Sequence, residues 1–248
     1  MKYIITTATT IILVMLVLIS FGQEATFNYT RDFKTILAQT KDPNSDLFYD
    51  KLLKRFEDDD TTITRPEALA LLIGFTDKPA YKPYNILETE RLIYSLNDEG
   101  KFKEAHDTAS LLLKTYPLSF QALKEMSYAC EKLGLPDSAN LYLNHVARIM
   151  RGMMYSGSGK TPETAMFALG PADGQHLLLG AGAGLGIMGS GSDKDGNFLD
   201  ILQAILPDGT KVNVYFNIQH ATLKMFDGKS VHEYLQDQQK GARKKATK

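Results

Sequence analysis

The chain has 248 residues, of which 44% are apolar and 23% are charged, and its formal net charge is -1. This composition is typical of a globular protein and argues against a disordered chain. The charge is too small to create a long-range field for a nucleic acid or an anionic membrane, so no nucleic-acid partner is predicted. Cys130 is the only cysteine, which excludes an internal disulfide and a thiolate metal cluster.

Residues 1–22 have the pattern of a secretory signal peptide. Lys2 supplies a positive charge, and residues 11–19 are an uninterrupted apolar run. Ser20 and Gly22 are small residues that suit cleavage between Gly22 and Gln23. This pattern predicts an exported protein, either periplasmic or extracellular. The alternative is an uncleaved anchor, because the apolar stretch approaches the roughly 20 residues of a spanning helix. The chain would then contact a membrane only through this segment.

Residues 23–151 are expected to form a helical domain. An amphipathic stretch over 47–56 is followed by three aspartates at 58–60, which favour a solvated loop over a calcium site. The sequence Thr-Arg-Pro-Glu at 64–67 indicates the start of another helix. Two prolines in residues 78–84 exclude regular helix there and indicate an extended connection.

Two segments after residue 87 repeat with a spacing of 34 residues. The matched pairs are Gly100 and Gly134, Ala105 and Ala139, Leu92 and Met126, Tyr94 and Tyr128, Leu96 and Cys130, and Ala109 and Leu143. This spacing resembles the tetratricopeptide repeat, in which glycine permits a tight turn between two helices and alanine permits their close approach. The large aromatic residue expected early in each unit is absent. The alternative is a pair of ordinary helical hairpins without a superhelix.

In such repeats the first helix of each unit lines a concave surface, which predicts candidate partner-binding residues. By alignment to the repeat these are Glu90, Tyr94, Asn97 and Asp98 from one unit, and Gln121, Lys124, Tyr128 and Glu131 from the next. Tyrosines bordered by mixed charges suit a protein or peptide partner. The alternative is an ordinary solvated helix face. The carboxylate-gripping form of the repeat has Lys and Asn where this chain has Glu90 and Tyr94, so the resemblance does not support that ligand.

Residues 152–228 change composition and are expected to form a small antiparallel β-rich domain, which makes the fold class α+β. Short strands are predicted at 164–169, 175–179, 198–205 and 211–218. The last two flank Pro-Asp-Gly and indicate a hairpin, and the alternation of apolar residues Val212, Val214 and Phe216 predicts one buried face. Residues 229–248 are expected to form a C-terminal helix and a basic tail.

Three segments resemble ligand-binding motifs but lack essential parts. Residues 157–161 resemble a phosphate-binding loop, yet Met154 stands where the first glycine is required. Residues 184–189 match the dinucleotide glycine pattern but are followed by a loop-like sequence, which favours a flexible connection. Asp193, Asp195 and Asn197 alternate like calcium ligands but lack the distal glutamate, which favours a plain hairpin turn. The five histidines share no metal-ligand spacing, so no cofactor and no metal are predicted.

Four stretches together resemble a family of exported bacterial proteins, the domain of unknown function numbered forty-nine nineteen. They are Tyr-Lys-Pro-Tyr at 81–84, Gly-Ser-Gly-Lys-Thr-Pro-Glu-Thr-Ala at 157–165, Asp-Gly-Asn-Phe-Leu-Asp-Ile-Leu at 195–202 and Val-Tyr-Phe-Asn-Ile at 214–218. The resemblance implies no known activity, catalytic residue or cofactor. It suggests that residues 157–165 mark the start of the β region.

The sequence favours a non-catalytic module that binds a protein or peptide. No nucleophile elbow or other catalytic motif is present. One alternative is an envelope hydrolase with a site between the domains, using His176 or Asp200. Another is an accessory protein that binds calcium or a small ligand.

Overall fold

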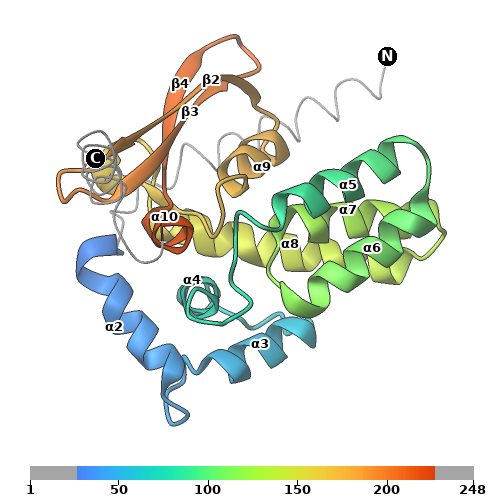
Figure 1. Ribbon diagram of the computed structural model, residues 1–248, viewed down its shortest axis with the longest axis horizontal. Helices are drawn as coiled ribbons and strands as arrows, with labels where there is room; N and C mark the ends of the chain where they lie inside the picture. The colour runs from blue at the N-terminus through green and yellow to red at the C-terminus, as the bar shows by residue number, and fades with distance from the viewer. Residues whose placement is uncertain (1–26, 227–248) are drawn as a thin grey trace, which may run out of the picture.

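The computed structural model describes residues 27–226. The predicted signal segment, the C-terminal helix and the basic tail lie outside these residues. The chain has an α+β fold, as expected (Figure 1). Among the described residues, no helix is both long enough and apolar enough to cross a membrane.

The first three described helices are α2 (Tyr29–Lys41), α3 (Tyr49–Glu57) and α4 (Arg65–Phe75), and α4 is the buried one. The predicted start of α4 is confirmed, because the Thr64 hydroxyl accepts from the backbone of Glu67 and the Glu67 carboxylate accepts from the backbone of Thr64. Helix α4 is buried from Ala68 to Phe75 and packs against α2, α3 and α8.

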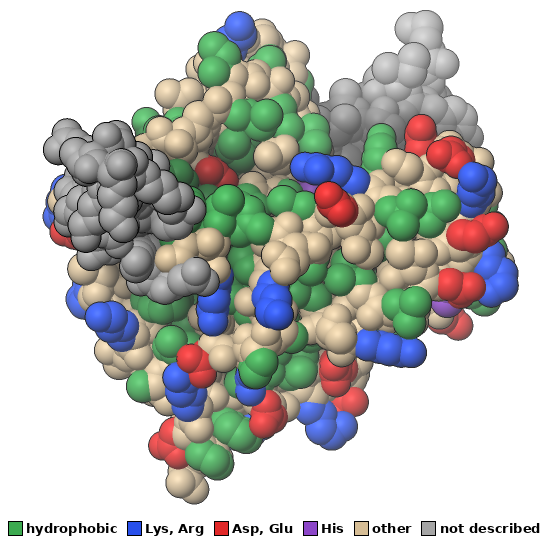
Figure 2. All heavy atoms as spheres, in the orientation of Figure 1, with side chains coloured by type: hydrophobic (Ala, Val, Ile, Leu, Met, Phe, Trp, Pro, Cys, Tyr) green, Lys and Arg blue, Asp and Glu red, His purple; other side chains and the backbone are tan. Residues whose placement is uncertain are grey.

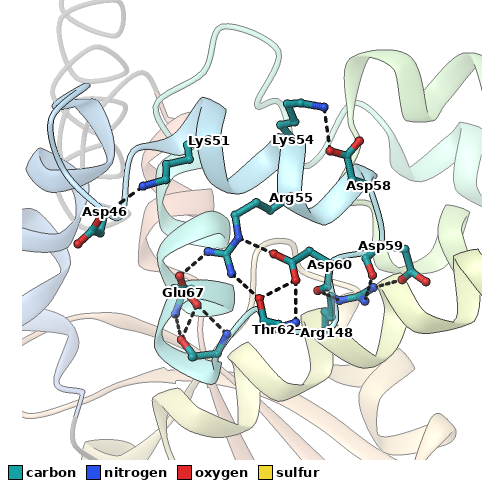
Figure 3. Close-up of polar contacts among 11 residues, drawn as sticks. Asp46, Lys51, Lys54, Arg55, Asp58, Asp59, Asp60, Thr62, Glu67 and Arg148 are labelled. Carbon is teal, nitrogen blue, oxygen red and sulfur yellow. Dashed lines mark hydrogen bonds and ion pairs between the residues drawn. The ribbon is translucent and has the colours of Figure 1, made fainter.

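The acidic loop between α3 and α4 is held by arginines (Figure 3). Asp60 accepts from Arg55 Nε at 2.7 Å, and its other oxygen accepts from the Thr62 backbone at 2.8 Å. Asp59 pairs with Arg148 of α8, whose side chain is only 4% exposed. Arg148 also donates to the backbone carbonyls of Asp59 and Asp60, at 2.9 and 3.2 Å. This loop therefore joins α3 to α8, and Asp59 and Asp60 are half-buried, whereas Asp58 is exposed as expected of a solvated loop.

Two helical hairpins follow. They comprise α5 (Leu87–Asp98), α6 (Phe102–Thr115), α7 (Phe120–Lys132) and α8 (Pro136–Ser156). Gly100 and Gly134 have φ of 76° and 73° in the turns, a conformation that glycine adopts without steric cost. Ala105 and Ala139 are buried between the helices, as the spacing predicted, and Cys130 belongs to the core.

Helix α8 crosses the expected domain boundary at residues 151 and 152 and carries the chain to the sheet. At Gly152 an added Cβ would lie 2.9 Å from backbone atoms of Ala68 and Leu69, so the glycine permits the close approach of α8 to α4. The buried side chains form one continuous cluster from the helical half into the β region. Within it, Tyr81 Oη donates to the Leu169 carbonyl at 2.6 Å.

The β region is a four-stranded mixed sheet in the order β1-β4-β3-β2. Its elements are η1 (Pro162–Thr164), β1 (Met166–Phe167), α9 (Asp173–Gly180), β2 (Gly184–Ser192), β3 (Phe198–Ile205), β4 (Lys211–Asn217) and α10 (Gln219–Met225). The β3–β4 hairpin is confirmed, with Leu199 opposite Asn217 and Ile205 opposite Lys211. The sheet is not purely antiparallel, because β1 pairs with β4 in parallel.

Two sequence predictions in this region are wrong. Residues 175–179 belong to α9 and not to a strand, because a short apolar run fits either element and Leu177 and Leu178 are buried on one side of a helix. Residues 184–189 belong to strand β2 and not to a flexible connection, since β2 pairs with β3 along most of its length. A side chain at Gly186 would collide with Gln203 of β3, because an added Cβ would lie 2.5 Å from the Gln203 side chain.

The segment that resembles a phosphate-binding loop forms a turn against β4. Gly159 has a φ of 67°. Its N–H donates to the Thr164 carbonyl at 2.7 Å, and its carbonyl accepts from the backbone N–H of Tyr215 in β4 at 2.9 Å. At Gly157 an added Cβ would lie 2.4 Å from the Thr164 carbonyl oxygen. These glycines thus join α8 to the sheet.

The predicted buried face of β4 extends over only part of the strand. Phe216 is fully buried, whereas Val212 is 39% exposed, because the β3–β4 hairpin projects beyond the helices (Figure 1).

Candidate functional site

A cleft of about 400 Å³ lies between helices α5 and α7 on one side and α9 on the other. Figure 2 shows basic, acidic and histidine side chains close together in this region, between α9 and α5. The residues that line the cleft come from α5, α7 and the segment through α9: Leu87, Glu90, Arg91, Tyr94, Gln121, Lys124, Pro171, Ala172, Gln175, His176 and Leu179. The cleft is therefore built by segments far apart in the sequence.

The α9 wall is fixed by a buried carboxyl group at its first residue. Asp173 Oδ2 accepts from the Gly170 backbone at 2.8 Å, which holds the Gly170–Pro171–Ala172 turn against the helix. At Gly174 an added Cβ would lie 2.7 Å from the Phe216 ring, so this glycine allows α9 to lie directly on the sheet. Sheet and turn together position His176 over α7, where its ring stacks on Phe120 with centroids 6.2 Å apart.

The cleft continues inward to a small cavity that contains two carboxyl groups. Its lining includes Glu90, Tyr116, Ser119 and Asp173. The Ser119 hydroxyl donates to Glu90 Oε1 at 2.6 Å and also caps α7 by accepting from Ala122. Burial raises the pKa of Glu90 to about 7, against the opposing effects of the Ser119 hydrogen bond and the Arg91 charge. Burial and then the nearby Glu90 raise the pKa of Asp173 to about 8.

Three further polar side chains at these cavities have a buried atom without a hydrogen-bond partner in the described structure. These atoms are Gln121 Oε1, His176 Nδ1 and the Tyr116 hydroxyl. Gln121 is only 6% exposed, and its amide nitrogen donates to Glu125 at 3.1 Å. Burial, followed by the charge of Lys124, lowers the pKa of His176 to about 4, so this side chain is neutral near pH 7. Unmatched buried polar atoms cost stability, so each of the three needs an explanation, and a ligand in the cleft is one.

The family comparison covers this cleft. The model of the family described as Domain of unknown function (DUF4919) matches residues 34–225. The chain belongs to this family. The resemblance predicted from the four sequence stretches is thereby confirmed. The DUF4919 match spans α5, α7 and α9, and so contains the whole lining of the cleft. No curated protein and no solved structure matched the chain.

Within the DUF4919 fold, four of the eight predicted partner-binding residues come together. They are Glu90, Tyr94, Gln121 and Lys124, which all line the cleft. Their common feature is a position on the side of α5 or α7 that faces α9. The repeat register therefore found one wall of the cleft.

The other four predicted residues lie elsewhere. Asn97 does not face solvent: it is 4% exposed and donates to the Glu125 carboxylate at 2.9 Å, because it lies where α5 crosses α7. Asp98 and Glu131 are exposed near the helix ends and are not part of the lining. Tyr128 packs edge-on against Phe102, beyond the cleft.

The α9 wall of the DUF4919 cleft was not predicted as a binding surface. Pro171, Gln175 and Leu179 line it, together with His176, which was named only for the hydrolase alternative. A helical reading of residues 173–180 would have placed Gln175, His176 and Leu179 on one side. The cation Arg91 was also missed, although it adjoins Glu90.

Two other candidate sites lie away from the cleft. Asp200 is on β3, where burial raises its pKa to about 6, and it is not among the lining residues. Asp193 Oδ1 accepts from the backbones of Asp195 and Asn197 at 2.9 and 2.8 Å, in the turn between β2 and β3. The segment suspected of calcium binding thus forms a hairpin turn closed by its own aspartate.

Proposed function

We propose that the protein is an exported interaction module whose cleft binds a segment of a protein or peptide. The observation that carries this proposal is the cleft itself, which has walls from α5, α7 and α9. A ligand in it would contact both halves of the chain at once. Sites of this kind, between structural units, are common places for ligands.

The size and lining of the cleft suit a few residues of an extended peptide. Its volume of about 400 Å³ is in the range of small-ligand sites. Leu87, Tyr94 and Leu179 offer apolar and aromatic surface, while the Gln175 amide can exchange hydrogen bonds with a peptide backbone. Exposed apolar side chains beside convergent polar groups favour a binding surface over an ordinary helix face.

The scaffold of this proposal is a pair of tetratricopeptide-like units. It is supported by the two glycine turns, by the buried Ala105 and Ala139, and by the packing of α6 on α7. Helix α4 packs against α8, and so covers the far end of the second unit. This arrangement would supply the neighbour that each repeat needs for its apolar face.

Export is supported by the signal-like pattern of residues 1–22, which lie outside the described structure. An exported module of this kind would meet its protein or peptide partner in the periplasm or outside the cell.

Binding has more support than hydrolysis. Of the two residues suggested for a hydrolase, His176 lines the cleft and Asp200 does not, so they do not form one site. The hydroxyl group nearest to Glu90 belongs to Ser119, which is 2% exposed and already caps α7. A buried helix cap of this kind is poorly placed to attack a substrate.

A pair of matched tyrosine variants tests the proposal. Tyr94→Ala is expected to weaken the interaction about tenfold, because an aromatic anchor in a cleft typically contributes 1–2 kcal/mol or more. Tyr128→Ala is the control, since Tyr128 is 42% exposed and Tyr94 is 53% exposed, but only Tyr94 lines the cleft. The measurement is quantitative crosslinking of the exported full chain in the cell envelope, followed by mass spectrometry. An equal effect of both variants, or no effect of Tyr94→Ala, would count against the proposed cleft.

A further inference from the structure

The wall formed by α5 and α7 carries two cations that face the cleft. Arg91 has no hydrogen bond and no ion pair within residues 27–226, although it lines the cleft. The Lys124 Nζ lies 3.2 Å from Glu125 Oε1, and 39% of the Lys124 side chain is exposed. Glu125 already accepts hydrogen bonds from Asn97 and Gln121 at 2.9 and 3.1 Å. The Lys124 charge is therefore shared with a carboxylate that has other partners, and the Arg91 guanidinium, although its charge acts on Glu90, has all its N–H groups available to a ligand.

Glu90 lies next to these cations with one oxygen unused. Its Oε1 accepts from Ser119, whereas its Oε2 has no hydrogen-bond partner among the described residues. Glu90 lines both the open cleft and the inner cavity, so it stands at the boundary between them. A protonated carboxyl group at this position has an O–H that can donate into the cleft.

From this arrangement we propose that the ligand is an acidic peptide, whose carboxylate is held by Arg91, Lys124 and a protonated Glu90, so that binding takes up a proton. The inference rests on the proposed peptide-binding function and specifies its chemistry. Charge-assisted hydrogen bonds from a guanidinium and an ammonium group are among the strongest that a carboxylate accepts. An ionised Glu90 would repel the same carboxylate, which is why the proton is part of the site.

The direction of the pH dependence follows from the groups around the cleft. Below pH 7 Glu90 is mainly protonated, and affinity for a carboxylate is highest; above pH 7 affinity falls as Glu90 ionises. The other titratable groups around the site are few among the described residues. Asp173 and Tyr116 line the inner cavity together with Glu90, Glu125 pairs with Lys124, and His176 lines the cleft from α9. His176 is neutral across this range, whereas Asp173 is protonated near pH 6 and about half ionised near pH 8, because burial shifts the pKa of each.

The test is calorimetric titration of the full chain with three peptides, near pH 6 and near pH 8. Acetyl-Ala-Ala-Ala has a terminal carboxylate, acetyl-Ala-Glu-Ala-amide has a side-chain carboxylate, and acetyl-Ala-Gln-Ala-amide has neither. At the lower pH at least one acidic peptide is expected to bind about tenfold more tightly than the neutral peptide, and to lose about tenfold at the higher pH. The stronger of the two acidic peptides identifies the source of the carboxylate.

Three variants separate the contributions to this result. Glu90→Gln keeps the acceptor for Ser119 and offers an N–H to the ligand, so it is expected to bind the acidic peptide and to lose most of the change between the two pH values, with Asp173 as the remaining ionising group. Arg91→Gln is expected to remove the preference for the acidic peptide. Lys103→Gln is the matched control, because Lys103 is exposed on α6 and paired with Asp107, outside the cleft.

The outcomes separate this inference from the function on which it rests. Equal binding of all three peptides would overturn the acidic-peptide inference and leave the peptide-binding proposal standing. No binding of any peptide, with crosslinking that still depends on Tyr94, would also overturn only the inference. No binding, with crosslinking that is unaffected by Tyr94→Ala, would remove both.

Discussion

The Asp173→Asn variant should gain stability relative to the wild-type protein as the pH rises from 5 to 8. Burial raises the folded-state pKa of Asp173 to about 8, from an ordinary value of 3.8. Its stabilising contribution is therefore complete below the ordinary pKa and is lost as the pH rises towards 8. Asparagine keeps the oxygen that accepts from Gly170 and cannot ionise, so the variant lacks this loss.

The expected size of this effect is large for a single substitution. Each pH unit between the two pKa values corresponds to about 1.4 kcal/mol per ionising group, so the difference in unfolding free energy should change by about 4 kcal/mol over the three units from pH 5 to pH 8. His145, His176 and His220 act in the opposite direction, because burial lowers their pKa values to about 4, 4 and 3. Their contribution is the same in both proteins and cancels in the comparison.

Urea unfolding at several pH values measures this difference. Asp195→Asn is a suitable control, because Asp195 is an exposed residue of the β2–β3 turn, and its curve should follow that of the wild-type protein. Parallel curves for Asp173→Asn and the wild-type protein would mean that Asp173 does not ionise at an unusual pH.

The Arg148→Met variant should lose about 3 kcal/mol of unfolding free energy. The substitution keeps most of the side-chain volume but removes the partner of the Asp59 carboxylate and of the backbone carbonyls of Asp59 and Asp60 (Figure 3). Only the arginine of this pair is fully buried, since the Asp59 side chain is 30% exposed, but its removal leaves a half-buried carboxylate and two carbonyls without a partner, which is costly. The loop between α3 and α4 would also lose its connection to α8.

Lys54→Met provides the control for this prediction. Lys54 pairs with Asp58 of the same loop, but both side chains are exposed, at 76% and 59%. Solvent screens such a pair, so its removal should leave the urea midpoint unchanged. Equal losses for Arg148→Met and Lys54→Met would show that burial of the arginine pair does not decide its contribution.

The parts of the fold that were predictable from the sequence have strong local signals. Gly100 and Gly134 occupy turns that require positive φ, and Thr64 with Glu67 forms the cap of α4. The Pro-Asp-Gly turn at 207–209 joins two strands with a regular register. In each case neighbouring residues determine the structure, so no distant contact was needed to predict it.

The missed parts depend on contacts between distant residues. Residues 175–179 form helix because Leu177 and Leu178 are buried on one side of it, and β2 forms because β3 lies beside it in spite of four glycines in the strand. Both predictions used local composition, which does not contain these contacts.

The candidate site shows the same division. The repeat register identified Glu90, Tyr94, Gln121 and Lys124 because they share one side of paired helices. It misplaced Asn97. The polar side chain and its spacing suggested an exposed position, but Asn97 is buried against Glu125. The α9 wall was beyond this reasoning, because nothing in a helical repeat indicates which later segment packs across it.

The most direct test of the central claim is photo-crosslinking from the α9 wall. A photoreactive residue replaces Leu179, which lines the cleft and is 49% exposed, or Leu143, which is 54% exposed on α8 outside the cleft. If ligands bind between α5, α7 and α9, a defined partner should crosslink at position 179 and be absent at position 143. Crosslinking at position 143 with none at position 179 would contradict the account.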